Sequence, residues 1–142
     1  MQKEMTDDFI RQRVHDYYWR DELSCATLTL KILSEKMDVP LHRQVLDASM
    51  CMNGAGKYGV QCGLLEGGLM FIGILGGKYG FDRTDSEAFC REYAAVFEER
   101  FGSLSCRDLR PQGFKPENPP HLCETLTVEG VAFTLDFLSD MV

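Results

Sequence analysis

Apolar residues recur along the chain at intervals of three and four positions, which is the spacing of one face of an α-helix. A first helix is predicted to begin at Thr6 or Asp7, a second at about Glu22, and a third at Pro40. Their apolar faces are Phe9, Ile10, Val14, Tyr17 and Tyr18; Leu23, Ala26, Leu30, Leu33 and Met37; and Leu41, Val45, Leu46 and Met50. The first third of the chain is therefore predicted to be helical.

The second half of the chain carries two further helix patterns. Thr84-Asp85-Ser86-Glu87 has the form of a capping box, and Gly102 is a natural helix stop. The proline-rich residues 111–120 are interpreted as a structured surface loop before a last helix. The apolar faces are Phe89, Tyr93, Val96, Phe97 and Phe101, and then Leu122, Leu126, Val131, Leu135 and Leu138. Because no run of alternating β-branched residues competes, we predict an all-α, single-domain bundle of about six helices over residues 1–142.

The segment VQCGLLEGGLMFIGILGG, residues 60–77, is apolar like a helix but rich in glycine. Each glycine inside a helix costs roughly 0.5–1 kcal/mol relative to alanine, so a close approach by another group is expected to compensate. Gly63 and Gly67 are one helical turn apart and leave one face bare beside Cys62. A neighbouring helix or a bound group could use that face. We predict a glycine-rich central helix here.

Charge and hydropathy exclude several classes of partner. The net charge of −7 argues against nucleic acid, because binding to phosphates relies on clustered Lys and Arg. The apolar stretch 64–77 contains Glu66 and is shorter than the ~20 residues of a membrane span. The first eight residues are polar and acidic, unlike a secretory signal. We therefore expect a cytoplasmic protein without a membrane partner.

The six cysteines are the candidate chemistry of this chain. In a reducing compartment, metal binding or redox chemistry explains them better than structural disulfides. Four of them, Cys25, Cys62, Cys106 and Cys123, fall near predicted helix starts, where free amide donors and the helix dipole favour a thiolate. Cys90 lies inside the helix after Thr84 and is interpreted as a packing residue. Cys51, beside two methionines at a helix end, stays ambiguous.

Several well-known motifs are absent or out of context. Residues 54–59 (GAGKYG) spell the dinucleotide-binding pattern, but a predicted helix rather than a strand precedes them, so we treat the match as chance. The chain has no C-x-x-C pair and no G-x-S-x-G, which weakens the zinc-ribbon, thioredoxin and serine-hydrolase hypotheses.

Four segments together resemble the C_GCAxxG_C_C family. They are Cys25-Ala26, residues 62–67 (CGLLEG), residues 101–109 (FGSLSCRDL) and Cys123. The resemblance extends from about Cys25 to the last helix, although Leu64 stands where the family has alanine. It implies a small helical protein whose shared cysteines are thought to be redox-active, related to the iron–sulfur domain of split-Soret-type cytochromes. The implied ligands are Cys25, Cys62, Cys106 and Cys123. From their spacing, Gly63 and Gly67 are candidate cofactor-binding residues on the helix face beside Cys62.

The leading hypothesis is an electron-transfer protein with an iron–sulfur cluster, most simply [2Fe–2S], held by these four cysteines. Zinc in the same cage is the closest alternative. A second alternative is a metal-free dithiol/disulfide protein in which Cys62 pairs with Cys25, Cys106 or Cys123. A third is a structural helical interaction module. The sequence indicates neither a catalysed reaction nor the protein that donates or accepts electrons, and a homodimer is compatible with it.

Overall fold

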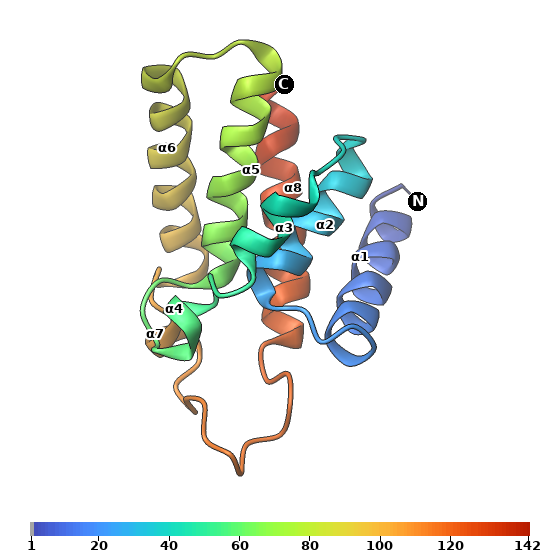
Figure 1. The fold of residues 1–142 in the computed structure, drawn as a ribbon, viewed down its shortest axis with the longest axis vertical. Helices are drawn as coiled ribbons and strands as arrows, with labels where there is room; N and C mark the ends of the chain where they lie inside the picture. Colours follow the sequence, from blue (N-terminus) through green and yellow to red (C-terminus); the bar gives the residue numbers. More distant parts are fainter. Residues whose placement is uncertain (1) are drawn as a thin grey trace.

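The computed structural model describes residues 2–142, which form helices and their connections (Figure 1). The helices are α1 (Gln2–Trp19), α2 (Cys25–Met37), α3 (Arg43–Ser49), α4 (Gly54–Lys57), α5 (Gly63–Tyr79), α6 (Arg83–Phe101), α7 (Cys106–Leu109) and α8 (Glu124–Met141). Of these, α4 and α7 are short, four residues each. Residues 2–142 contain no strand, only one isolated antiparallel bridge between Gln61 and Ser105. The prediction of an all-α fold is confirmed. About six helices were expected, and residues 2–142 form eight when the two short ones are included.

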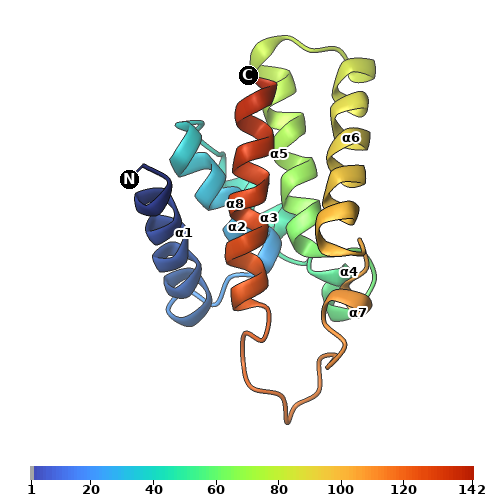
Figure 2. The same cartoon turned by 180° about the vertical axis from the view of Figure 1, so that it is seen from behind.

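Helix α5 is the centre of the bundle and packs against α2, α6 and α8 (Figures 1 and 2). A first apolar core lies among these helices, and a second lies where α1 covers α2 and α8. The first includes Leu30, Leu33, Leu64, Leu65, Phe71, Ile72, Leu75, Tyr93, Phe97 and Leu138. The second contains Ile10, Val14, Tyr17, Tyr18, Leu28, Ile32 and Val131. Most of the predicted apolar faces therefore point into one of two cores.

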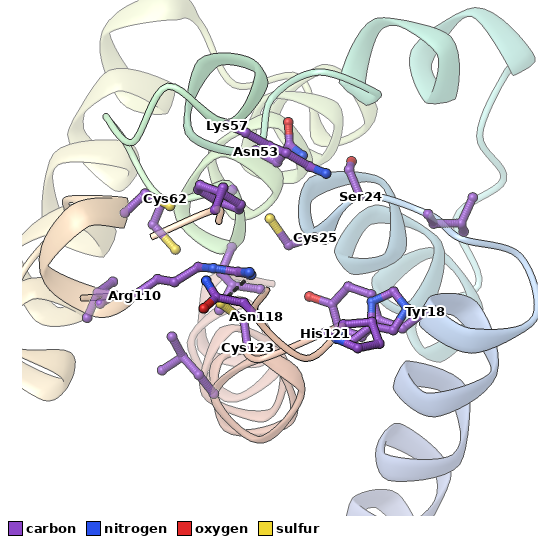
Figure 3. A pocket seen from close by; sticks show the side chains of 18 of the residues that line it. Tyr18, Ser24, Cys25, Asn53, Lys57, Cys62, Arg110, Asn118, His121 and Cys123 are labelled. Carbon is purple, nitrogen blue, oxygen red and sulfur yellow. Dashed lines mark hydrogen bonds between the residues drawn. The ribbon is translucent and has the colours of Figure 1, made fainter. Parts of the chain in front are cut away.

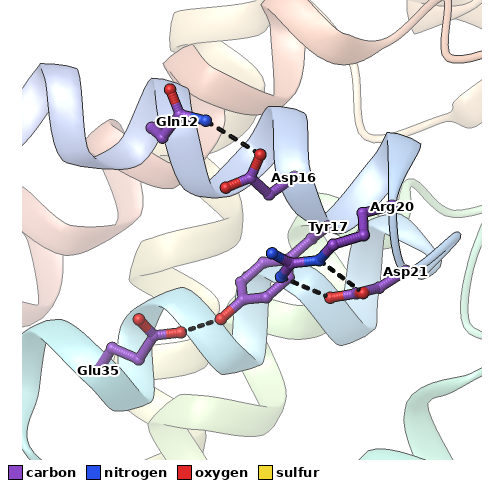
Figure 4. Close-up of polar contacts among 6 residues, drawn as sticks. All are labelled: Gln12, Asp16, Tyr17, Arg20, Asp21 and Glu35. Atoms are coloured by element: carbon purple, nitrogen blue, oxygen red, sulfur yellow. Dashed lines mark hydrogen bonds and ion pairs between the residues drawn. The ribbon is translucent and has the colours of Figure 1, made fainter.

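Polar contacts add to the attachment of α1. The Tyr17 hydroxyl donates a hydrogen bond to Glu35 of α2, as Figure 4 shows. Arg13 pairs with the same carboxylate, with 2.8 Å between Nε and Oε2. Burial, followed by the contact with Glu35, raises the pKa of Tyr17 to about 12. The edge of the second core is thus closed by side chains that hold α1 against α2.

Three helix starts differ from the prediction. Helix α1 already runs from Gln2, so Thr6 and Asp7 lie inside it and neither caps it. The reason is that the preceding residues contain no glycine or proline to stop the helix.

Helix α2 begins at Cys25, after the predicted Glu22, because Ser24 is its N-cap and its Oγ accepts a hydrogen bond from the backbone N–H of Thr27. Helix α3 begins at Arg43, not at Pro40.

The predicted capping box at the start of α6 is also wrong. Asp82, not Thr84, is the N-cap, and its Oδ1 accepts a hydrogen bond of 2.8 Å from the N–H of Asp85. Aspartate is at least as good a cap as threonine, and here it stands two residues earlier. The predicted stop at Gly102 is confirmed, since this residue ends α6 with a left-handed φ of 89°.

Most of the buried glycines of α5 allow neighbouring elements to come close. A Cβ built on Gly67 would lie 3.0 Å from the Ala26 carbonyl oxygen, and one on Gly68 would lie 2.3 Å from the Tyr93 hydroxyl. A Cβ on Gly76 would lie 2.5 Å from Ser86 Oγ. These positions place α2 and α6 directly against the backbone of α5. No helix within residues 2–142 combines the length and apolar character needed to cross a lipid bilayer.

Candidate functional site

A pocket of about 690 Å³ is lined by residues of α4, α7 and the connection from α7 to α8, among others (Figure 3). These elements lie together at one end of the molecule (Figure 1). All four cysteines singled out in the sequence line it, namely Cys25, Cys62, Cys106 and Cys123. Cys25 and Cys106 are the first residues of α2 and α7, while Cys62 and Cys123 are the N-caps of α5 and α8. The prediction that these four cysteines lie at helix starts is confirmed.

Backbone hydrogen bonds join the segment that carries Cys62 to the segment that carries Cys106. The N–H of Cys62 donates to the Leu104 carbonyl at 2.9 Å, and the N–H of Cys106 donates to the Val60 carbonyl at 2.6 Å. These bonds flank the isolated antiparallel bridge. Helix α4 closes this side through Gly54, whose φ is +71° and where an added Cβ would lie 3.2 Å from the Sγ of Cys106. The starts of α5 and α7 are therefore fixed against each other.

Gly63 places Cys25 beside the start of α5. A Cβ on Gly63 would lie only 2.1 Å from the Sγ of Cys25 and 2.8 Å from the Met52 carbonyl oxygen. The absence of a side chain at this residue therefore allows the thiol to rest on the first turn of α5. Gly63 also lines the pocket. Gly67, which its spacing of one turn from Gly63 placed on the same face, is buried against the neighbouring helix α2.

The side chain of Arg110 extends into the space among the pocket cysteines. Figure 3 shows its guanidinium directed toward the space among Cys25, Cys62 and Cys123, and its Nη1 lies 3.7 Å from Cys123 Sγ. Its Nε donates to the Gly113 carbonyl at 2.8 Å, and its Cζ lies 4.2 Å from the centre of the Phe114 ring. These contacts hold a positive charge beside the sulfurs.

Burial makes ionisation of the thiols unfavourable. It raises the pKa of Cys25, and the charges that Cys62, Cys123 and Cys106 would carry raise it further. Burial raises the pKa of Cys62 to about 11, although the backbone N–H groups of Leu64 and Leu65 oppose the rise. The pKa of Cys106 is raised by burial and by Cys123, whereas Arg110 lowers it. Ionisation of one thiol therefore makes ionisation of its neighbours less favourable.

All six cysteines are free in this structure. Within residues 2–142, no three His, Cys, Asp or Glu side chains lie close enough together to hold a single metal ion. Cys51 is exposed in the turn after α3, and Cys90 is half-buried in α6, as the helix pattern predicted for it. Neither lines the pocket.

Two loops complete the pocket with residues that the sequence reasoning did not select. Residues 53–59 contribute Asn53 and Lys57, and residues 110–121 contribute Arg110, Phe114 and Asn118, among others. Their spacing gave no signal, because each meets the cysteines only through the tertiary fold. The glycine-rich residues 54–59 form the short helix α4 and a turn, and no strand precedes them, so the dinucleotide-binding pattern is a chance match.

Tyr18 and His121 close one side of the pocket. Their rings stack with 4.8 Å between centroids, and Trp19 meets His121 edge-on at 4.7 Å. The buried Tyr18 hydroxyl is hydrogen-bonded to Thr127 Oγ1 at 2.7 Å. This wall joins α1 to the segment immediately before Cys123.

Comparison with known proteins identifies the family. Residues 23–137 match the family described as "Putative redox-active protein (C_GCAxxG_C_C)". The chain belongs to this family. The matched range includes all four cysteines of the pocket and both loops that complete it. No curated protein and no solved structure matches the chain. The family description supports redox activity as the general function of this C_GCAxxG_C_C protein.

Proposed function

We propose that this C_GCAxxG_C_C protein transfers electrons through an iron–sulfur cluster held by Cys25, Cys62, Cys106 and Cys123. The observation that carries the proposal is that four helix starts, separate in sequence, present their cysteines to one pocket. Four thiolates are the ligand set of a two-iron or four-iron cluster, and soft sulfur ligands favour such metals over hard cations. A bound cluster would supply reversible uptake of an electron.

The residues of the chain suit such a group electrostatically. Because burial and mutual repulsion oppose ionisation of the thiols, a cation that replaces their protons would offset both effects. The free N–H groups at the starts of α2, α5 and α8, together with Arg110, would partly balance the thiolate charge. The sulfurs must draw closer to bind metal, since no three ligands meet within residues 2–142. A single zinc ion would need all four at about 2.3 Å from one atom.

A metal-free dithiol is the second candidate. The contact of Cys25 Sγ with Gly63 places this thiol next to the residue that follows Cys62. Loss of two protons and two electrons would join the two sulfurs, provided that their Cα atoms are within about 7 Å. Cys25–Cys62 is therefore the pair that the packing favours.

Anaerobic reconstitution with ferrous iron and sulfide tests the first candidate. We expect the purified chain to bind iron and acid-labile sulfide and to develop visible charge-transfer absorption that bleaches on reduction. Cys62→Ser and Cys106→Ser should lower the bound iron at least severalfold. Cys51→Ser and Cys90→Ser are matched controls, because these cysteines do not line the pocket. Full iron binding by the Cys62 and Cys106 variants would refute the proposed ligand set.

Peptide mapping after mild oxidation of the iron-free protein tests the second candidate. A Cys25–Cys62 disulfide that dithiothreitol reverses would support it. Retention of six free thiols would exclude it. Zinc is distinguished by metal analysis of the same sample, because a zinc-loaded protein gives no visible charge-transfer band.

A further inference from the structure

The pocket is larger than a cluster and its ligands require. Its volume of about 690 Å³ falls within the ~300–1,000 Å³ range of small-molecule sites. A two-iron core adds only a few atoms to the cysteine sulfurs. The remaining wall is formed by residues 110–121 and by Lys57 and Asn53 of the opposite loop (Figure 3). Space beside the cysteines is therefore available for a second group.

This wall concentrates positive charge in an acidic protein. The pocket is lined by three basic side chains, Lys57, Arg110 and Lys115, and by one carboxylate, Glu22. The whole chain, in contrast, has 22 acidic and 15 basic residues. None of the salt bridges within residues 2–142 involves these three cations. Their charges are thus not neutralised by ion pairs with the chain itself.

Two of the cations are arranged around one aromatic ring. Arg110 Cζ lies 4.2 Å and Lys57 Nζ lies 6.0 Å from the centre of the Phe114 ring. Arg110 is held by the hydrogen bond from its Nε to the Gly113 carbonyl, and its Nη2 has no hydrogen-bond partner within residues 2–142, so this group can donate to a bound molecule. Asn118 is anchored in the same way, by Nδ2 to the Gln112 and Gly113 carbonyls. Preorganised cations next to an apolar ring suit an anion that has an apolar body.

We infer that the pocket binds a small organic dianion, whose charged groups meet Lys57, Arg110 and Lys115 and whose apolar body packs on Phe114. Two negative charges match the excess of two positive charges among the lining residues. The bound molecule would lie beside the cysteines, and its binding requires no cluster.

Isothermal titration calorimetry on the iron-free, reduced chain at low salt tests the inference. The probes are isophthalate and phenyl phosphate as organic dianions, benzyl alcohol as a neutral molecule and inorganic phosphate as an anion without an apolar body. We expect at least one organic dianion to bind at least tenfold more tightly than benzyl alcohol and inorganic phosphate. Preference between the two dianions distinguishes a dicarboxylate from a phosphate ester. Equal affinity for all four probes would overturn the inference.

Single substitutions locate the binding. Lys57→Gln, Arg110→Gln and Lys115→Gln should each weaken binding of the better probe about tenfold, because each removes a charge-assisted contact. Lys78→Gln is the control, since it changes the net charge equally at the other end of α5. The Lys57→Gln and Lys115→Gln variants keep the test valid if Arg110→Gln disturbs the loop of residues 110–121. An equal effect of Lys78→Gln, or no effect of any pocket variant, would overturn the inference.

Both proposals fail separately in these experiments. Iron binding is measured on the cysteine variants and probe binding on the lysine and arginine variants. A chain that binds the dianion but no iron would refute the cluster alone. A chain that binds iron but no probe would refute the dianion site alone.

Discussion

Two regions of the molecule are built on opposite principles. The first is the aromatic core, formed by Tyr93, Phe97 and Phe101 of α6 with Phe133 and Phe137 of α8. Its rings lie 4.7 to 6.3 Å apart between centroids, and Tyr93 and Phe97 are fully buried. The second is the cysteine pocket, which contains open volume, thiols and unpaired cations. Rings fill space in the first region, and reactive groups surround space in the second.

Backbone conformation differs between the two regions as well. Within residues 2–142, five residues other than glycine have a positive φ, which is unusual for such residues. Three of them, Glu22, Lys57 and His121, line the pocket, and Ala55 is in the adjacent α4. None of the five is in the aromatic core. Strained conformations of this kind cost about 1–3 kcal/mol each and persist where the surrounding structure holds them in place.

Helix α5 contributes to both regions through different glycines. Its first turn carries Gly63 at the pocket, and Gly68 meets Tyr93 at the aromatic core. The hydroxyl of Tyr93 is itself hydrogen-bonded to Thr134 at 2.6 Å, so this polar group is satisfied inside the core. The two apolar cores, the first of which includes the aromatic rings, stabilise a scaffold that can hold buried thiols and strained loops at the pocket.

The largest effect should come from the aromatic core. Phe97→Ala removes a fully buried ring that contacts Tyr93, Phe101 and Phe133, so we expect the free energy of unfolding to fall by about 3–5 kcal/mol. Chemical denaturation measures the loss. Iron bound per folded molecule should stay unchanged, because Phe97 does not line the pocket. Loss of iron binding by folded Phe97→Ala would mean that the aromatic core and the pocket are coupled.

The same substitution at two residues of α5 should distinguish the role of the pocket from that of the aromatic core. Gly63→Ala and Gly68→Ala each place a methyl group within 2.1 to 2.3 Å of another side chain, and each should cost up to about 3 kcal/mol of stability. Only Gly63→Ala displaces Cys25, so only this variant should also lower iron binding or Cys25–Cys62 pairing. Denaturation and iron analysis on both variants provide the check. Equal iron binding by the two variants would contradict the assignment of Gly63 to the site.

The sequence predicted the aromatic core better than the pocket. Tyr93 and Phe97 followed from helical spacing, because one face of a long helix is a local property of the chain. The helix-start placement of Cys25, Cys62, Cys106 and Cys123 was also local and was confirmed. Cap residues were missed where a better cap stood nearby, as Asp82 did beside Thr84.

The remaining parts of the pocket could not be read from spacing. Arg110 meets Cys123 from the far end of a loop, and Lys57 approaches Phe114 from another loop. Such contacts depend on how α4 and α7 pack, which is set by the hydrogen bonds around Cys62 and Cys106. The face that Gly63 and Gly67 share was open to a neighbouring helix or to a bound group, and at Gly67 the neighbour is helix α2.

Alkaline pH should lower the stability of the protein through the buried thiols of the pocket. The Cys62 thiol has a pKa of about 11 in the folded protein against 9.0 as its ordinary value, so the folded state keeps a proton that the unfolded chain releases. In the reduced, metal-free protein, the free energy of unfolding should therefore fall as pH rises from about 9 to about 11. Cys62→Ala should make the dependence on pH less steep. The loss of unfolding free energy between these two pH values should become smaller by an amount of the order of 2 kcal/mol.

Urea denaturation across this pH range, with reductant present, measures the slope. Burial raises the pKa of Cys25 and Cys106 too, so a reduced slope remains in the variant. Cys51→Ala is the control, because that residue is exposed. An unchanged slope in Cys62→Ala would show that the buried thiol does not contribute to the alkaline loss of stability.

The smallest effect concerns the end of α5 that faces away from both regions. Gly77 is exposed and helical, and a Cβ added there would meet no atom within 4 Å. Gly77→Ala should therefore raise the free energy of unfolding by about 0.5–1 kcal/mol, because alanine loses less backbone entropy in a helix. Gly73→Ala, one turn earlier and equally open, should act in the same direction. Suppose that either alanine instead destabilises the protein, and that light scattering gives the variant a lower molar mass than the unmodified protein. This glycine face then packs against a second copy of the chain.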